Sequence, residues 1–88
     1  MKLIIAIIRD SDTESVSRAL TSADYRVTCI ASTGGFLRRG QSTLLIGVED
    51  ERVERGLEII RESSAVPNDP NIKRATVFVL KVDQYTHL

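Results

Sequence analysis

Between two strand-like runs, residues 32–41 combine two adjacent glycines, an aromatic ring, two neighbouring arginines and an amide. Gly34 and Gly35 allow backbone N–H groups to approach an anion without a Cβ in the way. Phe36 can stack on a base, and Gln41 can pair with a base edge through one donor and one acceptor. A hairpin turn needs only two residues, so this segment is longer than the geometry requires. These residue types suit a site for a base and a phosphate.

A structural interpretation of the same segment stays open. Two adjacent glycines are common in turns, Phe36 can plug the core, and Arg38 and Arg39 can form a solvated hairpin tip. The glycines match neither a Walker-type phosphate loop nor a dinucleotide fingerprint. The pattern alone therefore favours neither binding nor structure decisively.

A strand-like run at residues 26–33 leads into this segment. Strand alternation divides the run between two faces, with Arg26, Thr28, Ile30 and Ser32 on one and Val27, Cys29 and Ala31 on the other. Arg26 can make charge-assisted hydrogen bonds to a phosphate, and Thr28 offers a hydroxyl. A ligand bound between subunits would contact this face and residues 32–41 together.

Nothing in the sequence predicts catalysis, a metal site or a cofactor. His87 is the single histidine and Cys29 the single cysteine, so neither an intrachain disulfide nor a zinc cluster is expected. No serine, cysteine or carboxylate pair has a spacing that indicates a nucleophile or an acid–base couple. The position of Cys29 in a strand-like run predicts a small, buried apolar side chain.

Length and charge narrow the class of protein. The 88 residues predict a single domain, 1–88, and the 12 basic and 12 acidic residues balance. A neutral chain argues against binding a nucleic-acid polymer, which needs a large basic surface. The apolar run at residues 1–8 is too short to span a bilayer and lacks a cleavage site. A cytoplasmic location is expected.

The chain alternates between strand and helix patterns. Residues 2–9, 26–33, 42–48 and 72–82 are predicted strands. Ser11 and Glu14 match a capping box at the start of a helix. Apolar residues at helical spacing mark two helix faces: Val16, Ala19, Leu20 and Ala23 on the first, and Val53, Gly56, Leu57 and Ile60 on the second. Gly56 on such a face suggests a close approach of helix and sheet.

The order βαββαβ predicts an α+β, ferredoxin-like fold, in which two helices cover one face of a four-stranded antiparallel sheet. In a monomer the helix-free face should be polar. Instead, the first and last strands are apolar at nearly every position. The strand pattern therefore predicts that the helix-free face contacts another subunit.

Three segments, residues 1–7, residues 26–28 leading into 32–40, and residues 75–83, resemble the PII-like cyclic-di-AMP receptor family. The resemblance covers most of the chain. It implies a ferredoxin-like fold and a homotrimer whose helix-free sheet faces pack together at the centre. It also implies a signal-transduction protein rather than an enzyme, which binds one cyclic-di-AMP in each of three clefts between subunits.

The resemblance also implies a set of ligand-binding positions. They are Arg26, Thr28, Thr33, Gly35, Phe36, Leu37, Gln41, Gly47 and Phe78. Arg26 and Thr28 would hold phosphate or ribose, and the backbone around Phe36 and Leu37 would contact an adenine, against which Phe36 packs. Gly47 would leave room in the cleft, and Phe78 would supply an apolar wall from one subunit.

The sequence departs from the family pattern in four places. Asp24 and Gln41 replace asparagines, and His87 replaces a glutamine. The long loop between the second helix and the last strand, the counterpart of the PII T-loop, is missing, because residues 63–71 span the gap. These departures leave open a trimer that senses another small nucleotide or anionic ligand, or a ligand-free interaction trimer. A downstream partner protein is expected, but the sequence does not identify it.

Overall fold

The computed structural model describes residues 1–32, 40–66 and 75–86. Its strands are β1 (Lys2–Arg9), β2 (Arg26–Ser32), β3 (Gln41–Val48) and β4 (Ala75–Lys81). Its α-helices are α1 (Thr13–Ser22) and α2 (Val53–Ser63), each preceded by a short 3₁₀ turn, Asp10–Asp12 and Asp50–Arg52. The predicted βαββαβ order is confirmed. Among the described residues, no helix is long and apolar enough to cross a membrane.

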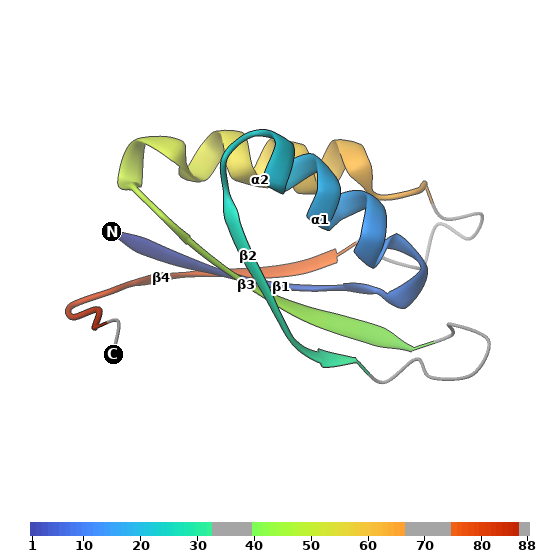
Figure 1. The fold of residues 1–88 in the computed structure, drawn as a ribbon, viewed down its shortest axis with the longest axis horizontal. Helices are drawn as coiled ribbons and strands as arrows, with labels where there is room; N and C mark the ends of the chain where they lie inside the picture. The colour runs from blue at the N-terminus through green and yellow to red at the C-terminus, as the bar shows by residue number, and fades with distance from the viewer. Residues whose placement is uncertain (33–39, 67–74, 87–88) are drawn as a thin grey trace.

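The four strands form one antiparallel sheet in the order β2-β3-β1-β4. Both helices lie on the same face of this sheet, and none of the described residues forms a helix on the other face (Figure 1). The fold is therefore the ferredoxin-like α+β arrangement predicted from the sequence. Strands β2 and β4 are the two edges of the sheet.

The core lies between the helices and the sheet. Alternate residues of the two central strands point into it and are almost fully buried: Ile4, Ala6, Ile8, Leu44, Ile46 and Val48. The helices contribute Val16, Leu20, Ile59 and Ile60. The predicted apolar helix faces are therefore confirmed, and each fully buried aliphatic side chain contributes about 1.5–3 kcal/mol to folding.

Gly56 lets α2 lie close to the sheet. A Cβ built at this position would lie 3.2 Å from Tyr25 Cε1 and 3.3 Å from Ile4 Cδ1. We expect Gly56→Val to lower the free energy of unfolding by about 1–3 kcal/mol, the usual cost of overpacking. Urea unfolding followed by circular dichroism measures this loss. The exposed Glu58 of the same helix gives the control, because Glu58→Val should change stability by less than about 0.5 kcal/mol. Equal stability of Gly56→Val and the wild type would contradict the close packing.

The predicted capping box at Ser11 and Glu14 is wrong. Ser11 lies within the first 3₁₀ turn, and α1 begins at Thr13 without a side-chain capping hydrogen bond from the preceding Asp12. The Asp12 carboxylate is instead bonded to Arg9 and to the backbone N–H of Ala65. Glu14 forms an ion pair with Arg18, one helical turn later. The residue before α1 therefore bonds to a residue distant in the sequence instead of capping the helix.

Two predictions for β2 need correction. The β2–β3 register shifts between Cys29 and Ala31, so a β-bulge interrupts the strict alternation expected across the strand. Cys29 is exposed rather than buried. It pairs with the buried Leu44 and therefore lies on the helix side of the sheet. Because β2 is an edge strand, the helices do not cover the Cys29 side chain.

Candidate functional site

Two rows of paired residues cross the helix-free face of the sheet from β2 to β4. The strand registers give the first row as Arg26, Gly47, Leu3 and Leu80. They give the second row as Thr28, Leu45, Ile5 and Phe78. Each row begins with a polar residue on the β2 edge and continues with apolar residues toward the β4 edge.

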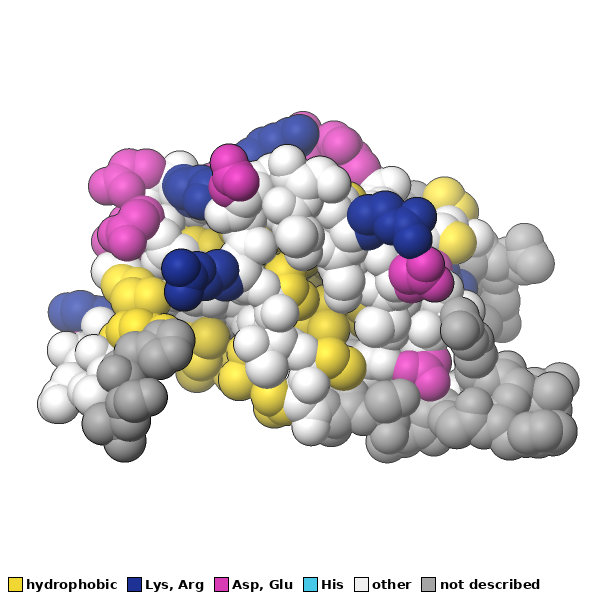
Figure 2. All heavy atoms as spheres, viewed as in Figure 1, with side chains coloured by type: hydrophobic (Ala, Val, Ile, Leu, Met, Phe, Trp, Pro, Cys, Tyr) yellow, Lys and Arg dark blue, Asp and Glu magenta, His cyan; other side chains and the backbone are white. Residues whose placement is uncertain are grey.

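This face is apolar and incompletely covered in a single chain. Phe78 is 51% exposed and Leu80 48% exposed, while Leu3, Ile5 and Leu45 are partly buried. Charged side chains gather over the helices, and hydrophobic side chains gather below them, over the sheet (Figure 2). Contiguous exposed apolar surface of this kind marks an interaction site. The predicted apolar character of the helix-free face is confirmed.

Arg26 brings an available positive charge to the edge of this face. Its side chain is exposed, and it forms no ion pair with any other residue that the structure describes. Thr28 lies two residues further along the same strand and is also exposed. The planar guanidinium of arginine suits bidentate bonding to a phosphate. The strand thus offers a phosphate donor and a hydroxyl on one face.

Gly47 lies directly opposite Arg26 in the β2–β3 ladder. A Cβ there would approach Met1 Cε at 3.2 Å, and that atom is the flexible end of a side chain. The end of the Met1 side chain therefore lies over this glycine, on the residue that pairs with Arg26. The structure brings together three of the predicted site residues, Arg26, Thr28 and Gly47.

Two other predicted residues lie far from this group within the chain. Phe78 is on the β4 edge, three strand spacings from Thr28, or about 14 Å. Gln41 begins β3, six residues before Gly47, or about 20 Å along the strand. A single chain therefore does not gather the described site residues into one pocket. Thr33, Gly35, Phe36, Leu37 and His87 lie outside the described residues.

Asp24 owes its position to the turn between α1 and β2. Its backbone φ is 66°, the left-handed conformation that asparagine and aspartate adopt more readily than most residues. Its carbonyl accepts a hydrogen bond from Arg52 at 3.2 Å, and it forms no ion pair with Arg26 or any other described residue. The turn geometry therefore accepts an aspartate as well as an asparagine.

Arg52 fixes the turn that leads into β2. It donates to the carbonyl of Ala23 at 2.6 Å, and its guanidinium lies 4.0 Å from the centre of the Tyr25 ring. The Tyr25 hydroxyl in turn donates to the Arg52 carbonyl at 2.9 Å. Sequence reasoning missed this contact, because no local spacing connects residues 25 and 52. The contact holds the backbone immediately before Arg26.

One carboxyl group near this end of the sheet has a shifted pKa. The pKa of Asp50 is lowered from its usual range, chiefly because the carboxylate accepts a hydrogen bond from the Met1 ammonium. The positive charges of Lys2 and Lys81 lower it further. Asp50 therefore stays ionised to a lower pH than an unperturbed aspartate and offsets part of the local positive charge.

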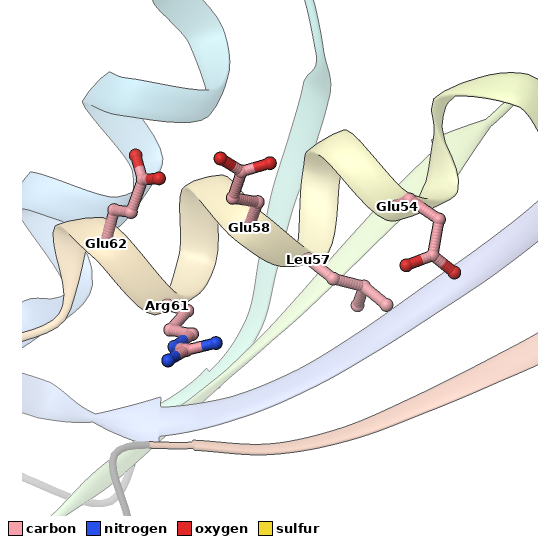
Figure 3. A pocket seen from close by; sticks show the side chains of 5 residues that line it. All are labelled: Glu54, Leu57, Glu58, Arg61 and Glu62. Atoms are coloured by element: carbon pink, nitrogen blue, oxygen red, sulfur yellow. The ribbon is translucent and has the colours of Figure 1, made fainter.

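A groove along α2 is unsuited to an anion. It has a volume of about 620 Å³ and lies along α2, where Glu54, Glu58 and Glu62 line it with Leu57 and Arg61. Figure 3 shows the three carboxylates spaced along the helix. Three negative charges against one positive charge repel a phosphodiester. Within the described ranges, no group of His, Cys, Asp and Glu could hold a metal ion.

Two comparisons with known proteins extend this description. A family model described as cyclic-di-AMP receptor matches residues 1–69, which include β1, α1, β2, β3 and α2 but not β4. The crystal structure of a functionally unknown protein from Pediococcus pentosaceus ATCC 25745 is also similar, with a TM-score of 0.81 and 38% identity. The match covers 99% of this chain and 96% of that chain. The Pediococcus pentosaceus protein therefore has no long insertion that this chain lacks.

Proposed function

This chain belongs to the cyclic-di-AMP receptor family, and we propose that it binds cyclic-di-AMP in clefts between the subunits of a PII-like homotrimer. The family consists of ligand-binding signalling proteins rather than enzymes. The observation that supports this site best is Arg26, an exposed arginine without an ion pair among the described residues, at the edge of an uncovered apolar sheet face. A cyclic dinucleotide combines two phosphates with two flat bases, so it needs cations beside apolar surface.

The distances within one chain support a cleft between subunits. Arg26 and Thr28 lie on the β2 edge and Phe78 on the β4 edge, too far apart to hold one phosphate and one base from the same side. Packing the helix-free faces of three subunits around an axis brings the β4 edge of one subunit toward the β2 edge of the next. The same packing covers Leu3, Ile5 and Leu45.

The proposed roles follow the chemistry of each side chain. Arg26 and Thr28 bind phosphate or ribose, and Phe36 and Leu37 contact adenine together with Thr33 and Gly35. Gly47 leaves space for the ligand, Gln41 contacts it through its amide, and Phe78 of the neighbouring subunit forms an apolar wall. We also propose that the protein is located in the cytoplasm and acts on a downstream protein partner.

Isothermal titration calorimetry with cyclic-di-AMP, ATP and AMP tests the choice of ligand. We expect saturable heat with cyclic-di-AMP at micromolar protein and much weaker binding of the two mononucleotides. Binding of ATP or AMP alone would show that the cleft holds a different nucleotide. The absence of heat with all three would leave a trimer without a nucleotide ligand and would refute the proposal.

A side chain at position 47 should weaken ligand binding without unfolding the chain. We expect Gly47→Leu to lower the affinity for cyclic-di-AMP by about fivefold or more, because overpacking a fitted site costs about 1–3 kcal/mol. Gly47→Ala should have a smaller effect. Calorimetry measures the affinity, and urea unfolding checks that stability is unchanged, as expected when the flexible Met1 side chain moves aside. Wild-type affinity of Gly47→Leu would remove this position from the cleft.

A further inference from the structure

The junction between β1 and α1 comprises Arg9–Thr13. It contacts the residue just before β3, Gly40, and a residue just after α2, Ala65. On the β3 side, the Asp10 backbone N–H donates to the Gly40 carbonyl at 2.9 Å. Arg9 pairs with Gln41 in the β1–β3 ladder. The junction therefore contacts the residues at which the chain enters β3, next to a proposed ligand contact.

On the α2 side, the same junction holds both backbone groups of Ala65. Arg9 Nε and Nη2 lie 3.1 and 3.0 Å from Asp12 Oδ2, and Arg9 Nη2 also donates to the Ala65 carbonyl. The Ala65 N–H donates to Asp12 Oδ1 at 3.2 Å. Asp12 is only 4% exposed, so both of its oxygens bond to protein groups away from most of the solvent.

Further hydrogen bonds fix this junction in place. The Thr13 hydroxyl donates to Ser42 Oγ at 2.7 Å, and the Ser42 hydroxyl donates to the Asp10 carboxylate. Ser42 is 1% exposed. The Ser15 hydroxyl, in the first turn of α1, lies 3.0 Å from the Ser63 carbonyl at the end of α2. The start of α1, the start of β3 and the end of α2 lie at the same end of the molecule (Figure 1).

We propose that the Arg9–Asp12 pair couples occupancy of the nucleotide cleft to the backbone of Ala65. This inference rests on the proposed function, because the ligand acts on the pair through Gln41. A ligand that restrains Gln41 restrains Arg9, its partner in the ladder. The guanidinium of Arg9 and the carboxylate of Asp12 then hold Ala65 more firmly. Linkage makes the effect reciprocal, so loosening Ala65 weakens ligand binding.

Two backbone amides report the two sides of the junction separately. The Asp10 N–H bonds to Gly40, and the Ala65 N–H bonds to Asp12. We expect saturating cyclic-di-AMP to slow hydrogen exchange at both amides of the full chain, measured by NMR. A slowing of about fivefold at Ala65 corresponds to the lower end of usual coupling between sites.

Asp12→Asn breaks the coupling while keeping the size of the side chain. In this variant, cyclic-di-AMP should still slow exchange at Asp10 but not at Ala65, and its affinity should fall about fivefold. Glu14→Gln is the matched control, because it loses the same charge two residues away. Glu14 is exposed, and its carboxylate bonds to Arg18 on the same helix. The control variant should behave as the wild type in both measurements.

The outcomes separate the coupling from the proposed function. If calorimetry registers cyclic-di-AMP binding but exchange at Ala65 in the wild type does not change, the coupling is refuted and the receptor function stands. If no cyclic-di-AMP binds, both are refuted. If Asp12→Asn does not fold, the wild-type exchange rates with and without ligand still decide the matter.

Discussion

Replacing Arg26 with alanine is expected to weaken cyclic-di-AMP binding by roughly tenfold to a hundredfold. Arg26 is exposed and forms no ion pair within the described part of the chain, so its charge is available to a phosphate. A hydrogen bond to a charged group contributes about 1.5–3 kcal/mol, and a bidentate arginine–phosphate contact is among the stronger ones. Calorimetric titration of the variant measures the loss as a change in Kd.

A second arginine provides the control for this substitution. Arg18 is also exposed, but it lies on α1 and pairs with Glu14, on the face away from the proposed cleft. Arg18→Ala removes the same charge and should leave the affinity for cyclic-di-AMP unchanged. Urea unfolding should show that both variants are as stable as the wild type to within about 0.5 kcal/mol. Unchanged affinity of Arg26→Ala would remove Arg26 from the site.

Placing a charge at the centre of the helix-free face is expected to convert the proposed trimer into monomers. Ile5 lies between Leu45 and Phe78 in the second row and is only partly buried in the single chain. Ile5→Lys would bury an ammonium group in each subunit of the assembly, at a cost of several kcal/mol per ion. Light scattering coupled to size-exclusion chromatography should show the particle mass fall to that of one chain. Cyclic-di-AMP binding should be lost with it, because the cleft needs two subunits.

Val66→Lys is the control for the effect of an added lysine. Val66 is apolar and 69% exposed, and it follows α2 rather than lying on the sheet. The variant should keep the mass of the wild type. Circular dichroism should show that Ile5→Lys remains folded, since the core on the helix side of the sheet is untouched. A trimer of unchanged mass in Ile5→Lys would contradict the proposed packing of the sheet faces.

Periodicity was enough to predict the architecture. The apolar run of β1 and the helical spacing on α1 and α2 gave the correct element order, because each pattern reports which side of its own element is buried. The apolar residues left over on β1 and β4 predicted the uncovered sheet face. These features depend on neighbours in the sequence, and the sequence displays them directly.

Tertiary context decided the features that were predicted wrongly. Strand alternation places Cys29 on the helix side of β2 but does not reveal that the edge strand leaves it exposed. Ser11 and Glu14 match the local pattern of a capping box, yet the Asp12 carboxylate between them is bonded to the N–H of Ala65, 53 residues away. The register shift at Cys29 also has no local marker.

In the candidate site, too, some features follow from local sequence and others depend on tertiary structure. Chemistry alone indicated Arg26 and Thr28, because a guanidinium and a hydroxyl two residues apart share a strand face. The proximity of Gly47 to Arg26 depends on the β2–β3 register, which connects residues 21 positions apart and is fixed only when the sheet forms. The separation of Phe78 from Thr28 depends on the strand order, and it is this separation that favours a cleft made by two subunits.

Whether the protein is a cyclic-di-AMP receptor with a cleft in each pair of neighbouring subunits is tested most directly by one calorimetric titration. The full chain at micromolar concentration is titrated with cyclic-di-AMP. We predict saturable heat with one ligand bound per chain, as three equivalent clefts in a homotrimer require. No heat with cyclic-di-AMP would contradict the proposed function.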